Sequence, residues 1–582
     1  MYNHIVNGIK IIPKVYLKKY YIIIFFQIIK FFLEIVSIGL ILPLIFMLAK
    51  GPEDLLIKLD KYLIILNIDR FYFEKNLIVI LLTVLIFAFL IKFLFILYST
   101  YFEKKCIEIS NVHTSTKLFK FYTNRINISV DEKNYNLIRN LTSETNNFYK
   151  IFVTGVILLI SESVKLIGYF LILVFINFKT FIIVCSVLSI FTIIYLLNTK
   201  KKLIIYGKKK SYISGVLIKY ITEGIESVKE IKLSNNFNFF ISRFQDYAMD
   251  NANVQTKFTF LQALPRQILE IVFIFAISAI IFFLALNSNN DFSDLLFILG
   301  VYVTVILKLI PSLNLLYKCL QDIFYSKETV KILSNELNKI NLFNTQKGNI
   351  KLSKINNDLK DLNLDSLTMK NISFSYNKEK KFIYNFSQTF KKGNTYCIYG
   401  PSGSGKSTII NLIMSFLEPD NGKILINNEI DIFENQKLWF NNISYLPQKI
   451  FLLNDNIINN VAFGVDEKNI NRSRVLEVLN KVNLYKELNK FDKGLETELG
   501  NNGLVLSGGQ AQRLGIARNL YSNKSLMILD EFTSSLDQTN EDKIFEEINK
   551  IKENKIIIIV SHSENIKMKC DQILEVSDGK IV

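Results

Sequence analysis

Six long apolar runs in the N-terminal part constrain the fold of this chain more than any other feature. Each run approaches the roughly 20 residues that an α-helix needs to cross a lipid bilayer. The runs cover residues 20–48, 77–98, 152–176, 180–197, 268–286 and 295–316. They predict a six-span α-helical transmembrane domain, in which the fourth run follows the third after a turn and therefore suits a helical hairpin.

The excess of Lys and Arg over Asp and Glu is concentrated in the part of the chain that contains these runs. Residues 1–335 contain 37 Lys and Arg against 22 Asp and Glu, whereas the rest of the chain contains 32 against 30. Because these cations flank apolar spans, they indicate membrane orientation rather than a nucleic-acid surface, and we expect no nucleic-acid partner. The five cysteines are far apart and lack CxxC spacing, which suggests neither a metal cage nor a disulfide framework.

The loops between the runs predict which side of the membrane each one faces. Lys and Arg are concentrated in residues 1–19, 103–150 and 199–266. Since cytoplasmic loops are enriched in Lys and Arg, both termini are predicted to be cytoplasmic. The two long inner segments are too polar for lipid, and we expect them to be cytosolic extensions of the spanning helices.

Two shorter helices are indicated by the loops. Residues 222–232 join a glycine break to an amphipathic piece, which is either a docking helix for a second domain or an ordinary solvated helix. On the outer side, one helical face carries Leu55, Leu59, Tyr62, Leu63 and Leu66. Such an outer helix lies either on the membrane surface or against the bundle.

A polar stretch divides the chain into two domains. Residues 335–364 are rich in Asn, Lys, Asp and Ser without a sustained apolar period, which predicts a linker. We therefore expect a transmembrane domain over residues 1–334 and a second domain over residues 365–582. Strands alternate with helices in the second domain, which predicts an α/β fold with a largely parallel sheet.

The second domain contains the complete phosphate-loop pattern GxxxxGK[ST] between a predicted strand at 395–399 and a predicted helix. Glycines let the backbone wrap tightly enough to aim several N–H groups at a triphosphate. Lys406 is expected to reach the β- and γ-phosphates, and Ser407 to offer its hydroxyl to Mg²⁺. The predicted nucleotide contacts are Gly400, Pro401, Ser402, Gly403, Ser404, Gly405, Lys406, Ser407 and Thr408.

Two acids end another apolar stretch of the second domain, Leu526-Met527-Ile528-Leu529. Asp530 is expected to hold Mg²⁺ together with Ser407. Glu531 is expected to polarise the attacking water as a general base. The phosphate loop makes the alternative, an exposed acidic strand end, the weaker interpretation.

A second helix start in this domain also suits phosphate. It consists of Ser507, Gly508, Gly509 and Gln510, which offer backbone N–H groups and a hydroxyl. One nucleotide rarely needs two such cradles. The motif therefore predicts a dimer in which the cradle of one copy closes on the nucleotide of the other.

With these motifs in place, nearly the whole chain resembles the half-transporters of the ATP-binding cassette (ABC) exporters. The resemblance implies that Tyr376 stacks on adenine and that Gln448 links Mg²⁺ to the transmembrane helices. It implies that His562 contacts the γ-phosphate, so that Glu531, His562 and Lys406 are the catalytic residues. It also assigns contacts with the docking helices to Thr497-Glu498-Leu499-Gly500, and contacts with the partner subunit to Ser534-Ser535-Leu536-Asp537.

Two residues depart from the pattern of this family without removing a catalytic group. Ser563 follows the histidine where Arg is common, and Ala511 follows the serine motif where a cation is common. The resemblance implies ATP and Mg²⁺ as cofactors and a homodimer with two equivalent ATP sites.

Charges inside the apolar runs bear on the cargo. Lys30 with Glu34, Glu162 with Lys165, and Arg266 with Glu270 are spaced to share helix faces. Lys92 and Lys308 have no such neighbour. They are explained either by a cavity for an anionic group or by snorkelling and interhelical pairing.

The segment 263–270 resembles the matching segment of bacterial flippases for lipid-linked oligosaccharides. That resemblance implies basic residues facing a pyrophosphate-linked glycan, here Lys92, Arg266 and Lys308. We expect an ATP-driven flippase or exporter of a lipid-linked oligosaccharide or related glycolipid in a bacterial inner membrane. The alternatives are an exporter of a peptide, a toxin or another lipid, and, remotely, a non-transport cassette ATPase.

Overall fold

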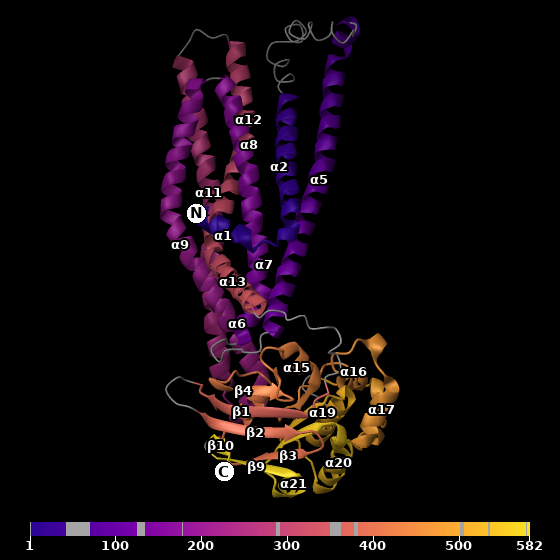
Figure 1. Ribbon diagram of the computed structural model, residues 1–582. Helices are drawn as coiled ribbons and strands as arrows, with labels where there is room; N and C mark the ends of the chain where they lie inside the picture. The colour runs from indigo at the N-terminus through magenta and orange to yellow at the C-terminus, as the bar shows by residue number, and fades with distance from the viewer. Residues whose placement is uncertain are drawn as a thin grey trace. The chain divides into compact units, whose positions relative to one another are not determined.

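The computed structural model describes residues 2–41, 70–124, 134–176, 178–286, 292–349, 363–376, 382–500, 506–533, 536–577 and 579–581 (Figure 1). The chain separates into two compact units, residues 1–345 and 346–582. We call them the helical unit and the sheet unit, and each is described by itself. The predicted outer helix, Ser534 and Ser535 lie outside the described residues.

The described part of the helical unit consists of helices. Short π-helical turns η1 (Asn140–Glu144) and η2 (Phe148–Val153) interrupt the path between α6 and α8. The helices are α1 (Tyr2–Ile11), α2 (Lys14–Gly39), α5 (Arg70–Asn124), α6 (Asn134–Arg139), α7 (Thr145–Asn147), α8 (Thr154–Ile176), α9 (Phe178–Glu226), α10 (Val228–Ser234), α11 (Phe237–Leu286), α12 (Phe292–Tyr325) and α13 (Lys327–Asn349).

Each of the six apolar runs contributes to a described helix: α2, α5, α8, α9, α11 and α12, in chain order. Three described stretches are long and apolar enough to cross a membrane: Ile78–Asn124, Asn134–Leu171 and Phe237–Phe275. An N-terminal helical domain is therefore confirmed, and the number of six spans stays a prediction.

Apolar side chains hold these helices together in pairs. Helix α8 packs against α12 and α2, and α9 packs against α11 and α12. One cluster joins Leu173 and Tyr195 to Leu269, Leu309 and Tyr317, all with less than a tenth of their surface exposed. Because protein interiors are close-packed, such clusters fix the positions of the helices that carry them.

A close approach of two helices depends on a glycine. A Cβ added to Gly207 in α9 would lie 1.8 Å from the backbone oxygen of Tyr325, at the end of α12. Nearby, the rings of Phe258 and Tyr325 stack at 3.9 Å between centroids. Only a residue without a side chain lets the two backbones come this close.

A polar network crosses the helices of this unit. Lys165 Nζ lies 2.8 Å from Glu162 Oε1 and 3.8 Å from Glu34 Oε2, while Ser312 Oγ donates to Glu162 Oε2 at 2.6 Å. The spacing of Glu162 and Lys165 predicted their pairing correctly. Glu34, however, pairs with Lys165 on another helix, because α2 and α8 pack side by side.

The segment 222–232 differs in detail from the prediction. Gly224 lies inside α9, and the break follows at Ser227 (φ −102°), after which α10 begins. The expected glycine break is therefore wrong. Glycine tolerates a helical backbone, and nothing lies within 4 Å of a Cβ added to Gly224.

Helix α13 continues into the predicted linker and ends at Asn349. Leu333 and Ile340 are buried in the cluster of α1, α2 and α5, and Leu337 packs against it. These side chains form an apolar stripe with helical spacing, and residues 335–349 of the predicted linker are helical.

The described part of the sheet unit forms two β-sheets. A four-stranded antiparallel sheet has the order β2-β1-β4-β5, and a six-stranded sheet has the order β10-β9-β3-β8-β7-β6. Strands β9, β3, β8, β7 and β6 run parallel. The strands are β1 (Ser366–Phe374), β2 (Ile383–Lys391), β3 (Thr395–Tyr399), β4 (Asn421–Ile426), β5 (Ile430–Asp431), β6 (Ile443–Leu446), β7 (Leu526–Asp530), β8 (Ile556–Val560), β9 (Gln572–Ser577) and β10 (Lys580–Ile581).

Helices cover the larger sheet and complete the expected α/β fold. The longer ones are α14 (Lys406–Ile413), α17 (Arg472–Lys481), α19 (Gly508–Ser522) and α20 (Gln538–Ile551). Strand β8 is buried along its whole length, as its continuous run of Ile and Val predicts for an interior parallel strand. The larger sheet thereby brings the carboxyl ends of β3, β7 and β8 to one edge, where polar loops follow.

Candidate functional site

The phosphate loop lies between β3 and α14, as the sequence predicts. Gly400, Gly403 and Gly405 all have positive φ (154°, 83° and 110°). A Cβ at Gly400 would lie 2.2 Å from the backbone oxygen of Val576, so this strand end accepts only glycine. The loop can therefore adopt the tight wrap that exposes its N–H groups.

Helix α14 presents an open amino end to this loop. Its N-cap is Gly405, which has no side chain to accept a hydrogen bond from the first turn. Ser404 Oγ is buried, and the described residues provide it with no hydrogen-bond partner. Unpaired donors at a helix N-terminus attract anions, so the loop fits a phosphate group.

Lys406 is the cation of the loop. Its Nζ donates to the backbone oxygens of Gly400 and Pro401, both at 2.8 Å. Burial lowers the pKa of Lys406, and the nearby carboxylates of Glu531 and Asp530 partly offset this effect. A phosphate would supply the negative charge that favours the protonated amine.

Asp530 ends β7 next to the loop. Tyr445 from β6 donates its hydroxyl to Asp530 Oδ2 at 3.2 Å. Burial, reinforced by the charge of Glu531, raises the pKa of Asp530, while the Tyr445 hydrogen bond and Lys406 lower it. A bound divalent cation would compensate the buried carboxylate, which suits the predicted role.

The carboxylate of Glu531 contacts two of the predicted site residues, one at each oxygen. Gln448 Nε2 donates to Glu531 Oε2. His562 Nε2 lies 3.4 Å from Glu531 Oε1, and the two side chains are 42% and 25% exposed. The structure thus brings together three residues that are far apart in sequence, at a position that water can reach.

The backbone at Glu531 is also unusual. Its φ is 48°, a left-handed value that non-glycine residues rarely adopt. Its N–H donates to the Val560 oxygen at 2.9 Å, and its own oxygen accepts a hydrogen bond of 3.2 Å from Gln512 Nε2. These contacts hold the turn that follows β7. Sequence reasoning missed Gln512 and Tyr445, because neither carries a motif signal of its own.

Tyr376 lies beside the start of α14. Its hydroxyl is 3.0 Å from Thr408 Oγ1, and its ring packs edge-on against Phe374 and Phe382. The side chain is 55% exposed, which leaves one ring surface open for an aromatic base.

The Ser507 motif forms a complete capping box at the start of α19. Ser507 Oγ accepts from the Gln510 N–H at 3.3 Å, and Gln510 Oε1 accepts from the Ser507 N–H at 2.9 Å. Gln510 also donates to Glu487, which Arg513 binds with both terminal nitrogens. Among the described residues, no hydrogen bond or ion pair joins Ser507, Gly508, Gly509 or Gln510 to the phosphate loop.

The three predicted cargo residues belong to the helical unit. Lys92 (α5) lies within electrostatic range of Lys308 (α12), Lys165 and Glu34, and stands 5.3 Å from the centre of the Phe89 ring. Arg266 (α11) is set apart by its pairing with Glu270 at 3.2 Å, where both side chains are largely exposed. The structure therefore places Lys92 within electrostatic range of Lys308, whereas the ion pair of Arg266 among the described residues is with Glu270.

Comparison with protein families gives a match within the sheet unit. Residues 383–534 match the family model described as "ABC transporter". This range includes the phosphate loop, Gln448, the Ser507 motif, Asp530 and Glu531.

Comparison with curated proteins gives similar bacterial exporters. The chain is 28% identical to an ATP-dependent lipid A-core flippase of Saccharophagus degradans, over 62% of this chain and 59% of that protein. It is 28% identical to a putative export ATP-binding/permease protein of Rickettsia typhi, over 79% of each. A lipid A-core flippase of Haemophilus ducreyi is 37% identical over 37% of each chain. The matched regions thus span less than two thirds of both flippases.

The fold is also similar to a solved exporter. A bacterial Atm1-family ABC exporter with ATP bound superposes with a TM-score of 0.70, covering 94% of this chain and 93% of that one at 19% identity. This likeness extends the comparison to the helical unit, where the sequence motifs are few. The comparisons therefore support an ABC exporter half-transporter: residues 383–534 match the ABC transporter family, and the chain has the exporter fold, in which a helical domain precedes the ATP-binding cassette.

Proposed function

We propose that this protein hydrolyses ATP to move a lipid-linked oligosaccharide, or a related anionic glycolipid, outward across a bacterial inner membrane. The observation that carries the proposal is the group of Glu531, Gln448 and His562 next to the phosphate loop. A carboxylate held in this way beside an anion-binding helix end is suited to activating water for phosphoryl transfer.

Each residue of the ATP site has a proposed role. The backbone of residues 400–408 and the Lys406 amine bind the phosphates, and the open Tyr376 ring stacks on the base. Glu531 accepts a proton from the attacking water, and Gln448 and His562 orient its carboxylate from both oxygens. His562 also contacts the γ-phosphate in this proposal.

Magnesium fits the oxygen donors beside the loop. Ser407, Gln448 and Asp530 would hold Mg²⁺, and the burial of the Asp530 carboxylate supports a cation there. The ion supplies charge neutralisation to the transferred phosphoryl group.

The Ser507 motif supports a homodimer. Its hydroxyl and N–H groups form a helix end that the phosphate loop of the same chain does not contact among the described residues. In the proposed dimer, Ser507, Gly508, Gly509 and Gln510 of one protomer complete the ATP site of its partner.

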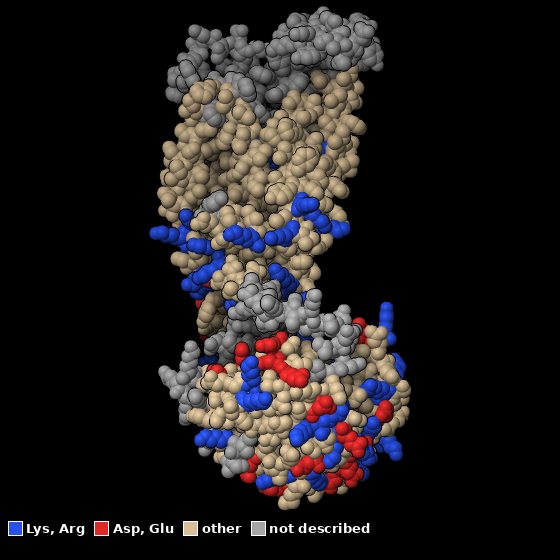
Figure 2. Space-filling model, viewed as in Figure 1, with Lys and Arg blue, Asp and Glu red and all other residues tan. Residues whose placement is uncertain are grey.

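The helical unit supports a membrane position with six spans and both termini in the cytoplasm. On the face shown in Figure 2, a broad zone with almost no charged side chains is bordered by Lys and Arg. Such a border is typical of the cytoplasmic end of spanning helices.

The cargo assignment rests on charge. Lys92 and Lys308 come from different helices and lie within electrostatic range of each other, and Lys92 is also within range of Lys165 and Glu34. Because like charges are costly there, an anionic headgroup would stabilise them. Similar proteins named lipid A-core flippases support a lipid cargo.

The test compares ATP hydrolysis by the purified protein in proteoliposomes that contain different cargo candidates. We expect polyprenyl-pyrophosphate glycans to stimulate hydrolysis more than zwitterionic phospholipids or peptides. Stimulation by peptides alone would replace the lipid proposal with a peptide exporter. The Glu531→Gln variant provides the background rate in each lipid mixture.

A further inference from the structure

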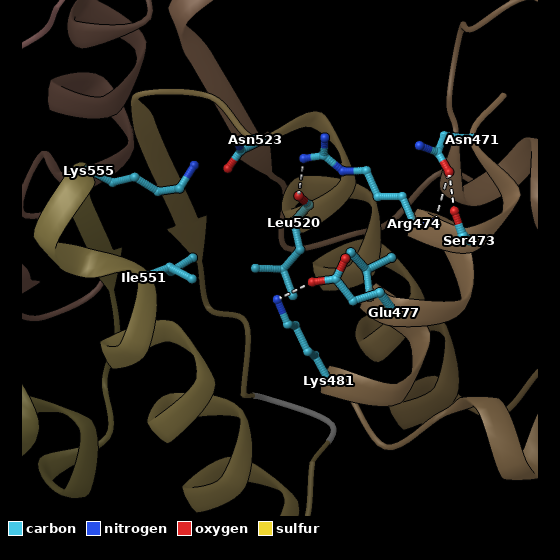
Figure 3. Close-up of a pocket in the computed structure, with 10 residues that line it drawn as sticks. Asn471, Ser473, Arg474, Glu477, Lys481, Leu520, Asn523, Ile551 and Lys555 are labelled. Atoms are coloured by element: carbon cyan, nitrogen blue, oxygen red, sulfur yellow. Dashed lines mark hydrogen bonds and ion pairs between the residues drawn. The ribbon is translucent and has the colours of Figure 1, made fainter. Parts of the chain in front are cut away.

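The sheet unit contains a polar cavity that takes no part in the ATP site. Its volume is about 430 Å³, and it lies between α17, the carboxyl ends of α19 and α20, and the approach to β8 (Figure 3). The lining residues with charged side chains are Arg474, Glu477, Lys481 and Lys555.

Lys555 is the most buried cation of this cavity, with 6% of its surface exposed. Its Nζ donates to the Lys524 backbone oxygen at 2.6 Å, and this is the one acceptor that the described residues provide. An ammonium group has three donors. The remaining two are therefore available to a ligand, and in Figure 3 the Lys555 side chain reaches into the space beside Asn523.

Arg474 reaches the same cavity from α17. Its Nη2 donates to the Leu520 oxygen at 3.4 Å, and its guanidinium lies 5.5 Å from the centre of the Tyr521 ring. No carboxylate pairs with Arg474 among the described residues. Arg474 therefore keeps most of its donors open, like Lys555 across the cavity.

The two cations oppose each other electrostatically. Burial, together with the positive charge of Arg474, lowers the pKa of Lys555 to about 8. The remaining pair relieves only part of this excess, because Glu477 is bound to Lys481 at 2.6 Å and acts on Arg474 through charge alone. The cavity thus carries a net positive charge, because its three cationic lining residues outnumber Glu477, its one acidic lining residue among the described residues.

We propose that this cavity binds a small molecule that carries a phosphate group. A phosphate offers several acceptor oxygens and up to two negative charges, which match the open donors of Arg474 and Lys555 from opposite sides. The volume lies within the range of small-molecule pockets and is too small for a folded partner. None of the lining residues belongs to the phosphate loop or the Glu531 group, so this is a second site and does not depend on the proposed transport.

The experiment is isothermal titration of the full-length protein in detergent, with its ATP site saturated by a non-hydrolysable ATP analogue and Mg²⁺. Inorganic phosphate and glucose 6-phosphate are the probes. We expect binding of one probe molecule per chain. Tighter binding of glucose 6-phosphate supports an organic phosphate as the ligand, and equal binding supports recognition of the phosphate group alone.

Arg474→Gln and Lys555→Gln should each weaken binding by about tenfold or more, because each removes a charge-assisted contact. Arg472→Gln is the matched control: Arg472 is on the same helix, but its side chain is 68% exposed, pairs with Glu496 and does not line the cavity. A melting curve of each variant verifies folding, and Arg474→Gln alone suffices if the buried Lys555 variant fails to fold. Absence of binding at millimolar probe, or equal losses in Arg472→Gln and Arg474→Gln, would overturn the proposal.

Discussion

The helical unit and the sheet unit place their charged groups in opposite ways. In the sheet unit, Glu531 and His562 follow the ends of parallel strands and remain accessible at one edge. In the helical unit, Glu162 is 2% exposed and is compensated from two helices, by Lys165 and Ser312. Strand ends are set by local sequence, whereas cross-helix pairing depends on how the helices pack. The functional residues of the sheet unit can therefore be recognised from sequence motifs. The charge pairs of the helical unit can be recognised mainly from the packing of its helices.

The largest effect is expected at the accessible charges. Glu531→Gln keeps the size and one acceptor oxygen of the side chain but removes the base. We expect ATP hydrolysis to fall by about 10²–10⁴-fold while ATP binding is retained. Phosphate release and nucleotide binding are measured on the same preparation. Glu546→Gln, an exposed substitution on α20, is the control, and normal hydrolysis by Glu531→Gln would show that another group is the base.

Removing the partner of a buried charge in the helical unit should lower the stability of the protein rather than its catalytic rate. Lys165→Met leaves Glu162 buried without its ammonium partner, which is expected to destabilise the unit by about 3–5 kcal/mol. Thermal unfolding in detergent is the measurement. The double variant Lys165→Met/Glu162→Gln should recover part of the loss.

The control for this pair is Lys219→Met, which removes an exposed partner of Glu223 and should cost less than about 1 kcal/mol. Equal losses in Lys165→Met and Lys219→Met would mean that the cross-helix network does not stabilise the helical unit.

Packing of the helical unit can be tested at two glycines of the same helix. Gly207→Ala forces α9 away from the Tyr325 backbone, and we expect a loss of about 1–3 kcal/mol from overpacking. Gly224→Ala meets open space and should be neutral or stabilising, because alanine favours the helix. The melting temperatures of the two variants are compared. If Gly207→Ala melts no lower than Gly224→Ala, the close approach of α9 and α12 is not a feature of the folded protein.

The smallest effect is expected for the cargo residues. Lys92→Gln and Lys308→Gln should each raise the glycolipid concentration needed for half-maximal stimulation of hydrolysis by about threefold to tenfold, without changing the basal rate. Arg266→Gln should have less effect, since Glu270 already pairs with Arg266. A larger effect of Arg266→Gln than of both lysine variants would move the proposed headgroup site to α11.

Much of the local structure of the sheet unit could be predicted from its sequence. The strands at 395–399 and 556–560 and the loop between β3 and α14 occur where the motifs predict them, because short apolar runs and glycine patterns specify local backbone. Tyr445 and Gln512 were missed, since their contacts with Asp530 and Glu531 arise only when the strands assemble.

The helical unit is less predictable for the same physical reason. Helix periodicity identified the Glu162–Lys165 pair on one helix but assigned Glu34 to Lys30, whereas the packing of α2 against α8 brings Glu34 to Lys165. The end of α13 was also missed, because Leu337 and Ile340 gain their apolar neighbours only in the folded unit.

The central claim is that ATP hydrolysis in the cassette drives lipid movement by the helical unit. The most direct measurement follows hydrolysis and translocation of a fluorescent polyprenyl-pyrophosphate glycan in the same proteoliposomes, for the wild-type protein and for Glu531→Gln. We expect both activities in the wild-type protein and the loss of both in the variant. Translocation that continues in Glu531→Gln, or wild-type hydrolysis without any movement of the glycolipid, would contradict the account.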